Sequence, residues 1–539
     1  MPTIAKMLVD EFVHYGVDVV FGLPGGEIVE VLDLIRDHGI DFVLVRNENA
    51  ACFMAETYAR LTGKPGVVLT TLGPGATNAY AGVANAYLDR APILFLTAQT
   101  DPELLDRYTH QVLDLQACFA PITKFTIELS PTNAAHSIRY AFQKMLSGRP
   151  GPVHLGICNR VARTHLEEIP PHSAISGKPQ PILHDLYRAV ERLQTAQRPI
   201  IVTGLGIIPD YRDQQVQLLA ELLQAPVVDT PKSKGVLSAY HPLFAGTIGL
   251  TQHDPAYALL DESDCIVAIG LDVVELVKVW NQPQPLIWIA NCENQNPRIP
   301  SEIELIAPIG DVLERLNGLI QHAVQALDWG VNRVQQFRQT MEAFSIPVAL
   351  STERVSPMDV IETVREHTPL DVIITTDVGS HKIFTALNWK ALQPNRYFVS
   401  NGLSTMGFGL ASAISAARET GATTVCIVGD GGLSMGMGEL GLAVELALPL
   451  IVVVMNDNAL DLIRNAQIQR NKPTFGTEFS NPNYEALASA FGYGYFRVEN
   501  KAACVHAMQQ AVEYRHPVLI DALIDPNGYT FKYLRQLQG

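Results

Sequence analysis

The sequence lacks any stretch of about 18 uncharged apolar residues, so no membrane span is expected. It has no CxxC pair, and its 7 cysteines are scattered, which argues against a disulfide framework and favours reduced cysteines in a cytoplasmic protein. Basic residues are in deficit, with 39 Lys and Arg against 55 Asp and Glu and a net charge of −16. This balance argues against nucleic acid or an anionic membrane as partner.

The chain also lacks low-complexity tracts and short-period repeats. Its first residues predict a helix rather than a signal peptide. Thr3 can cap that helix and Gly16 can end it, while Asp10 and Glu11 interrupt any apolar leader.

Short apolar runs alternate with helical patterns along all 539 residues. The runs are rich in Val and Ile and are continuous rather than alternating, as in Val67–Thr71, Cys265–Ile269 and Leu450–Met455. Continuous apolar strands are buried on both faces, which predicts parallel sheets covered by helices.

Two stretches, 166–182 and 345–357, contain several prolines or end in Ser-Pro and indicate linkers. The blocks between them have a common domain size. The sequence therefore predicts an α/β protein of three doubly wound parallel-sheet domains, at 1–165, 183–340 and 355–539.

The strongest motif lies in the third block, where Gly429-Asp430-Gly431-Gly432 follows a predicted strand. A helical pattern and another strand then lead to Asp457. One helix plus one strand returns the chain to the same edge of a parallel sheet, where ligands bind in open α/β proteins.

Two aspartates at that edge suit Mg²⁺, which prefers hard oxygens and shares its coordination with phosphate. The glycines let backbone N–H groups approach a phosphate. A plainer interpretation is two strand-end turns that merely use Asp and Gly.

This paired segment resembles the thiamine-diphosphate motif of the acetolactate synthase and pyruvate decarboxylase superfamily. The resemblance implies that Asp430, Asp457 and the carbonyl of Ala459 hold Mg²⁺, and that Gly429, Gly431 and Gly432 approach the diphosphate. Many relatives have Asn at the position of Asp457. The resemblance covers essentially the whole chain and implies a pyrimidine-binding, a central and a diphosphate-binding domain.

In the first block, Glu48 lies in a RxExxAA context, and Pro74 and Asn78 lie in a GPGATN run. On sequence alone, Glu48 is one solvated helix-start acid among 55 acidic residues. The resemblance implies instead that it hydrogen-bonds the aminopyrimidine ring and so activates the cofactor, with Pro74 and Asn78 near the same ring.

Two further loops resemble parts of the family's cofactor site. The first resembles the family's loop that donates hydrogen bonds to the diphosphate. The second resembles the loop whose methionine supports the bent cofactor from below. The residues concerned are Val378, Gly379, Ser380 and His381 in the first loop, and Ser404 and Met406 in the second. The plainer interpretations are a helix-start histidine without a ligand and a core methionine.

Local matches favour the catabolic acetolactate synthase type. His110, Gln111 and Lys124 match polar positions near the substrate, and Leu460 lies where the substrate end is expected, with Leu462, Ile463 and Ala466 after it. The stretch 269–275 replaces the Arg-rich flavin-binding segment of biosynthetic enzymes, so FAD is not expected.

The resemblance implies a carboligase that decarboxylates a 2-oxo acid, most simply pyruvate, and joins the acyl unit to a carbonyl acceptor. The product would be an acyloin such as 2-acetolactate. It also implies a homodimer with inter-subunit active sites, or a homotetramer built from such dimers.

Alternatives are a 2-oxo acid decarboxylase, and a lyase or carboligase using glyoxylate, formaldehyde or a longer acyl donor. A binding paralogue without turnover is a further alternative. A nicotinamide dehydrogenase would need a GxGxxG turn, which the Gly204-Leu205-Gly206 turn does not provide.

Overall fold

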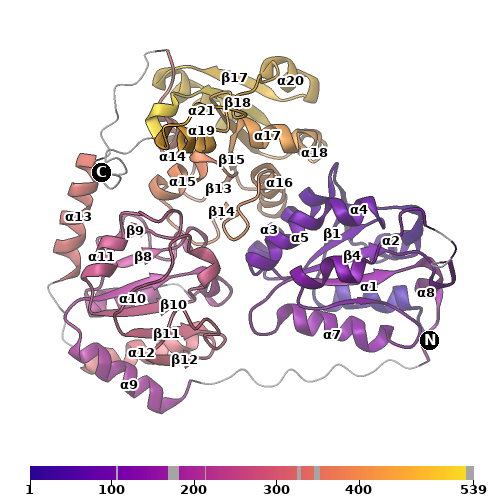
Figure 1. Ribbon diagram of the computed structural model, residues 1–539, viewed down its shortest axis with the longest axis horizontal. Helices are drawn as coiled ribbons and strands as arrows, with labels where there is room; N and C mark the ends of the chain where they lie inside the picture. The colour runs from indigo at the N-terminus through magenta and orange to yellow at the C-terminus, as the bar shows by residue number, and fades with distance from the viewer. Residues whose placement is uncertain are drawn as a thin grey trace. The chain divides into compact units, whose positions relative to one another are not determined.

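The computed structural model describes residues 1–104, 107, 109–167, 181–212, 214–323, 329–344 and 353–529. In these residues the chain forms three sheets of six strands each, with helices packed around them (Figure 1). Every pairing between the named strands is parallel. The predicted fold class is therefore confirmed.

The first sheet has the order β2-β1-β3-β4-β6-β5. Thr3 caps the first helix by accepting a hydrogen bond from the Lys6 N–H at 3.2 Å, as predicted. The strands are β1 (Val19–Leu23), β2 (Asp41–Leu44), β3 (Gly66–Thr70), β4 (Ile93–Ala98), β5 (Thr126–Glu128) and β6 (Val153–Ile157). The helices are α1 (Ile4–His14), α2 (Val29–Asp37), α3 (Glu48–Thr62), α4 (Pro74–Asn78), α5 (Tyr80–Leu88), α6 (Leu115–Phe119), α7 (Ala134–Leu146) and α8 (Asn159–Arg163).

The second sheet has the order β12-β11-β10-β7-β8-β9. Its strands are β7 (Pro199–Thr203), β8 (Val227–Asp229), β9 (Phe244–Thr247), β10 (Cys265–Ile269), β11 (Leu286–Ala290) and β12 (Ile303–Ile306). The helices are α9 (Leu183–Thr195), α10 (Gln215–Leu223), α11 (Tyr257–Glu262), α12 (Ile309–Ala323) and α13 (Gly330–Phe344).

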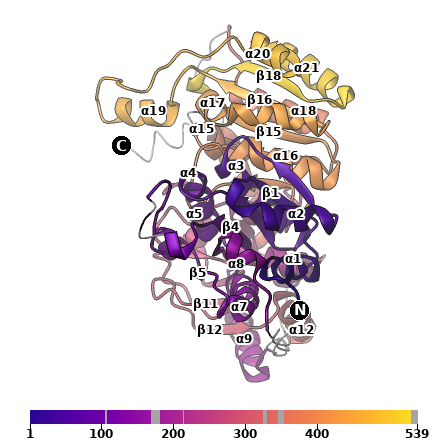
Figure 2. The same cartoon turned by 90° about the vertical axis from the view of Figure 1, so that its right-hand side faces the viewer.

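The third sheet has the order β14-β13-β15-β16-β18-β17, so the ends of β13, β15 and β16 are neighbours. Figure 2 shows α19 standing away from this sheet. The strands are β13 (Ile373–Thr376), β14 (Tyr397–Val399), β15 (Thr424–Gly429), β16 (Leu450–Asn456), β17 (Gly494–Val498) and β18 (Val518–Leu523). The helices are α14 (Pro357–His367), α15 (Ser380–Asn388), α16 (Phe408–Thr420), α17 (Asp430–Gly436), α18 (Leu440–Glu445), α19 (Asp461–Gln469), α20 (Tyr484–Phe491) and α21 (Lys501–Tyr514).

Contacts divide the chain into two compact units. The first contains the first sheet together with Gly402–Gly421 and Met435–Leu448, and the second contains the other two sheets. Within the first unit α16 packs along α3, where the hydroxyls of Thr57 and Ser412 are 2.8 Å apart. The three domain boundaries proposed from sequence stay predictions, and most of the two predicted linkers, 168–180 and 345–352, lies outside the described residues.

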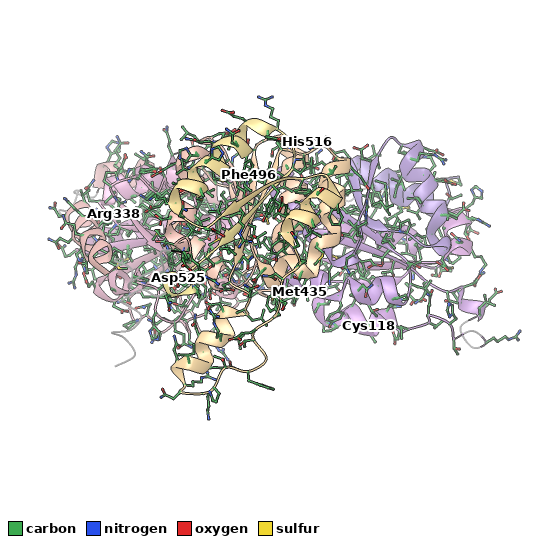
Figure 3. The ribbon with its side chains drawn as sticks, turned by 90° about the horizontal axis from the view of Figure 1, so that it is seen from above. Cys118, Arg338, Met435, Phe496, His516 and Asp525 are labelled. Carbon is green, nitrogen blue, oxygen red and sulfur yellow. The ribbon has the colours of Figure 1, made fainter. Side chains whose placement is uncertain are left out.

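None of the described helices is long and apolar enough to cross a membrane. All seven cysteines are free, as predicted. Five are buried, while Cys292 and Cys118, which is labelled in Figure 3, are partly exposed.

Candidate functional site

The carboxyl edge of the third sheet brings the two predicted aspartates to neighbouring strand ends. Asp430 follows β15 and starts α17, and Asp457 follows β16, which pairs with β15 along its length. The N–H of Asn458 donates to Asp430 Oδ2 at 2.7 Å, so the two turns are joined directly. The spacing argument for one shared site is thus supported by geometry.

Both carboxyl groups are buried, and burial raises the pKa of each. For Asp457, burial and then the charges of Asp430 and Asp461 raise the pKa to about 7. Arg464, 3.9 Å from Asp457, opposes this shift. A divalent cation would relieve the repulsion and favour both anions, so these hard oxygen donors fit Mg²⁺.

Within the part of the chain that the structure describes, no group of three or more His, Cys, Asp or Glu side chains could hold a metal ion. A cation here would therefore combine the two aspartates with other oxygens, such as a backbone carbonyl and phosphate. Ala459 lies in the same loop, and its N–H donates to Asp457 Oδ1 at 3.1 Å. The next residue, Leu460, donates its N–H to the Thr477 carbonyl at 2.7 Å.

Asn481 belongs to this cluster but was not singled out from sequence. Its Nδ2 lies 2.8 Å from Asp430 Oδ2, 2.9 Å from Asn456 Oδ1 and 3.1 Å from Asn458 Oδ1. It therefore holds the Asp430 carboxylate against the end of β16 without supplying a charge. Asn481 stands in a polar loop with no motif, so no sequence signal marks it.

The loop after β13, with Val378 and Gly379, reaches the same edge of the sheet. The buried His381 accepts a hydrogen bond from the Gly429 N–H at Nε2, at 3.2 Å. Burial lowers its pKa to about 4, so the ring is neutral at pH 7. A Cβ at Gly379 or Gly429 would lie 2.8 or 2.9 Å from the ring atom Cε1, which requires glycine at both positions.

Neighbouring donors of this edge also have protein partners. Ser380 Oγ donates to Asp461 Oδ2 at 2.8 Å, and the Gly431 N–H donates to Asp430 Oδ1 at 2.8 Å. A Cβ at Gly432 would lie 3.0 Å from the Asp377 carboxyl carbon. The loops thus approach each other closely, and the contact of these groups with a diphosphate stays a prediction.

In the first unit, Glu48 is the first residue of α3 and is only 6% exposed. Asn78 Nδ2 donates to Glu48 Oε2 at 3.1 Å, so the two side chains lie together, and their contact with a ring stays a prediction. A Cβ at Gly75, next to Pro74, would lie 3.2 Å from Glu48 Oε1. The carboxyl group is therefore buried and oriented, and it is not the solvated helix-start acid of the plainer interpretation.

Gln111 lies against the same turn. Its backbone has a left-handed φ of 61°, and a Cβ at Gly73 would lie 2.7 Å from its carbonyl oxygen. His110, beside it in sequence, is exposed. The structure therefore brings Gln111 to the Pro74 turn, and its contact with substrate stays a prediction.

Lys124 is held elsewhere in the first unit. Its ammonium group donates to the carbonyls of Ser147 and Arg149, both at 2.6 Å. These hydrogen bonds fix the side chain on the α7–β6 connection, and its predicted contact with substrate stays untested.

The predicted wedge loop precedes α16 in the first unit. Met406 is partly buried there. Ser404 and Gly407, on either side of it, have φ angles of 55° and 90°, so the loop turns sharply around the methionine.

The second sheet carries the Gly204-Leu205-Gly206 turn at the end of β7. The Leu205 N–H donates to Glu275 Oε2 at 2.8 Å, and Thr230 Oγ1 donates to Oε1. A Cβ at Gly204 would lie 2.6 Å from the Leu271 Cα. The protein's own carboxyl group thus occupies the donor that a dinucleotide phosphate would use. Burial raises the pKa of Glu275 to about 8.

A cavity of about 380 Å³ lies in the second unit. Trp389, Phe337, Met341 and Arg338 contribute to its lining, and Arg338 is labelled in Figure 3. None of the predicted site residues lines it. The candidate site is therefore placed by its chemistry and not by this cavity.

Comparison with known families matches segments from all three sheets to domains of one enzyme family. Residues 2–118 match the family described as thiamine pyrophosphate enzyme, N-terminal TPP binding domain, and residues 377–522 match its C-terminal TPP binding domain. Residues 186–316 match its central domain. The chain belongs to the thiamine pyrophosphate enzyme family, whose terminal domains bind thiamine diphosphate.

Particular relatives are similar over nearly the whole chain. The acetolactate synthase of Bacillus subtilis (strain 168) is 30% identical, with 97% of this chain and 93% of the relative covered. The acetolactate synthase isozyme 3 large subunit of Escherichia coli (strain K12) is 31% identical, with 99% and 96% covered. The acetolactate synthase large subunit of Lactococcus lactis subsp. lactis (strain IL1403) is 29% identical, with 97% and 93% covered.

Asn481→Ala is expected to weaken Mg²⁺-dependent binding of thiamine diphosphate roughly tenfold, because Asp430 loses the amide that orients it. Calorimetric titration of the purified protein measures this affinity. Asn483→Ala is the matched control, since Asn483 only caps α20 by accepting from the Ala486 N–H at 3.0 Å. Equal affinities for the two variants would contradict the assignment.

Glu275→Gln is expected to gain stability relative to the wild type as pH rises from 4.5 to about 8. The folded wild type keeps a proton that the unfolded chain releases above 4.5, so its stability falls through this window by roughly 1.4 kcal/mol per pH unit. The glutamine can accept from Leu205 and donate to Thr230. Thermal unfolding of both proteins across the window measures the difference, and a constant gap in Tm would refute the shift.

Proposed function

We propose that this chain is a thiamine-diphosphate-dependent acetolactate synthase that uses pyruvate as donor. The observation that carries this proposal is the presence of two prepared half-sites. One is a buried acid, Glu48, oriented by Asn78. The other is a pair of buried aspartates, Asp430 and Asp457, on joined turns. The names of the full-length relatives support the reaction.

The two aspartates would hold Mg²⁺ with the carbonyl of Ala459, and the turns at Gly379 and Gly429 would hold the diphosphate. When bound, the cofactor supplies the electron sink that lets a 2-oxo acid lose CO₂. Glu48 would share a proton with the aminopyrimidine ring, since its carboxyl group is buried and lies at the start of α3. Met406 would support the cofactor from below.

The substrate end would be formed by His110, Gln111 and Lys124, with Leu460 and the first turn of α19. Carboxylate and carbonyl oxygens of the two 2-oxo acids would meet the polar groups. Since Lys124 donates to two backbone carbonyls, a direct role would require it to exchange one of them. The position of Gln111 against the Gly73 turn supports a role for this residue at the substrate end.

We infer that the working form is a homodimer in which Glu48 of one chain faces Asp430 of the other. Exposed apolar side chains on α19 support this assembly: Leu462 is 43% exposed, Ile463 52% and Ile468 53%. Phe475, just after this helix, is 87% exposed. Exposed apolar side chains gathered in one short segment favour an interface, and a second copy of the chain would cover them.

Purified protein supplied with thiamine diphosphate, Mg²⁺ and pyruvate is expected to release CO₂ and form 2-acetolactate. Product identity is read by mass spectrometry. Glu48→Gln is expected to lower kcat by roughly 10²–10⁴-fold, because an amide cannot exchange the proton. Free acetaldehyde as sole organic product would favour a decarboxylase instead.

Mixing Glu48→Gln and Asp430→Asn chains after dissociation and reassembly tests the shared site. If each site takes Glu48 and Asp430 from different chains, half of the dimers are mixed and each has one intact site. About a quarter of wild-type activity then returns from two inactive variants. No recovery, with mixed dimers shown by native mass spectrometry, would place both groups in one chain.

A further inference from the structure

Glu439 is a buried acid in the first unit that the proposed reaction does not use. It ends the short helix Met437–Glu439 before α18 and is 2% exposed. Its Oε1 accepts hydrogen bonds from the N–H groups of Arg46 and Asn47, at 2.8 and 2.9 Å. The other oxygen, Oε2, is buried and has no hydrogen-bond partner among the described residues.

These two N–H groups belong to the residues that immediately precede Glu48. Asn47 is the cap of α3, and its side chain accepts from the Asn49 N–H at 3.0 Å. Glu48 is therefore fixed from behind by Glu439, through the backbone, and from its side-chain end by Asn78 at 3.1 Å. A carboxyl group that exchanges a proton must be placed within a fraction of an ångström.

We propose that Glu439 is a positioning residue that holds the start of α3 and thereby sets the orientation of Glu48 toward the aminopyrimidine ring. The proposal rests on the proposed function, because it assigns Glu439 to the group that activates the cofactor. One carboxylate oxygen accepts from two adjacent N–H donors immediately before the helix and so ties the backbone there to a buried group.

A second acid offers a matched control. Glu445 forms an ion pair with the side chain of Arg46, but its own side chain is 59% exposed. An exposed pair of this kind contributes little. Glu445→Gln therefore removes the same charge from the same segment and leaves at most a neutral hydrogen bond to the Arg46 side chain, while the backbone N–H groups before Glu48 keep their acceptor.

The first measurement uses the cofactor-free protein. Glu439→Ala is expected to speed deuterium uptake at the amides of Arg46 and Asn47, read by mass spectrometry, whereas Glu445→Gln leaves uptake unchanged. Glu439→Gln keeps an oxygen that can accept both donors, so it is expected to restore most of the protection. Unchanged uptake in Glu439→Ala would overturn the proposed anchoring.

The second measurement is hydrogen–deuterium exchange at thiamine C2 in the holoenzyme, which needs no 2-oxo acid. Glu439→Ala is expected to slow this exchange roughly 10- to 100-fold, while the affinity for thiamine diphosphate changes little. Glu439→Gln is expected to restore most of the wild-type rate of C2 exchange. If Glu439→Ala fails to fold, Glu439→Asp, which withdraws the acceptor by one methylene, is expected to show a smaller slowing.

The Glu48→Gln variant separates the positioning role of Glu439 from the proposed function of Glu48. Loss of C2 exchange in Glu48→Gln but a wild-type rate in both Glu439→Ala and Glu439→Asp would overturn the positioning role alone. A wild-type rate in Glu48→Gln would instead overturn the proposed function of Glu48, whichever product pyruvate gives. Equal slowing in Glu439→Gln and Glu439→Ala would also overturn the proposal, since hydrogen-bond acceptance would then not be the property that matters.

Discussion

The burial of two aspartates at neighbouring ends of parallel strands is the constraint on which the edge of the third sheet depends. Burial alone disfavours each anion, and their mutual repulsion disfavours them further, so the pKa of Asp457 rises to about 7. Groups from the surrounding loops form hydrogen bonds with these carboxyl groups and their neighbours. Asn458 and Asn481 donate to Asp430, while Arg464 donates to Asp461 at 2.7 Å and lies farther from Asp457.

The sequence was sufficient for the fold class and for the position of the two aspartates. Continuous apolar strands such as Cys265–Ile269 and Leu450–Met455 are buried along their whole length, as their composition requires. One helix and one strand between Asp430 and Asp457 return the chain to the same edge, because parallel strands all end there. Both arguments depend on local pattern, which sequence displays directly.

The partners of these residues could not be predicted, because they come from distant segments without a motif. Asn481 reaches Asp430 from a polar loop, and Glu439 reaches Arg46 from a segment 393 residues further along the chain. The resemblance implies that the glycines at 379 and 429 approach a phosphate, yet a Cβ at either position would also meet the His381 ring. Such contacts depend on how loops pack in three dimensions. Loop packing leaves no periodic pattern in a single sequence.

The two half-sites are built on the same plan, although one lies in each unit. In each, a carboxylate stands at the start of a helix and is oriented by an asparagine amide from another segment: Asn78 for Glu48, and Asn481 for Asp430. An amide orients a carboxylate without neutralising it, whereas an arginine or lysine would pair with it. In the proposed function, this leaves Glu48 free to meet the aminopyrimidine ring and Asp430 free to meet Mg²⁺. This choice of a neutral partner is what makes a buried acid useful for chemistry rather than only for structure.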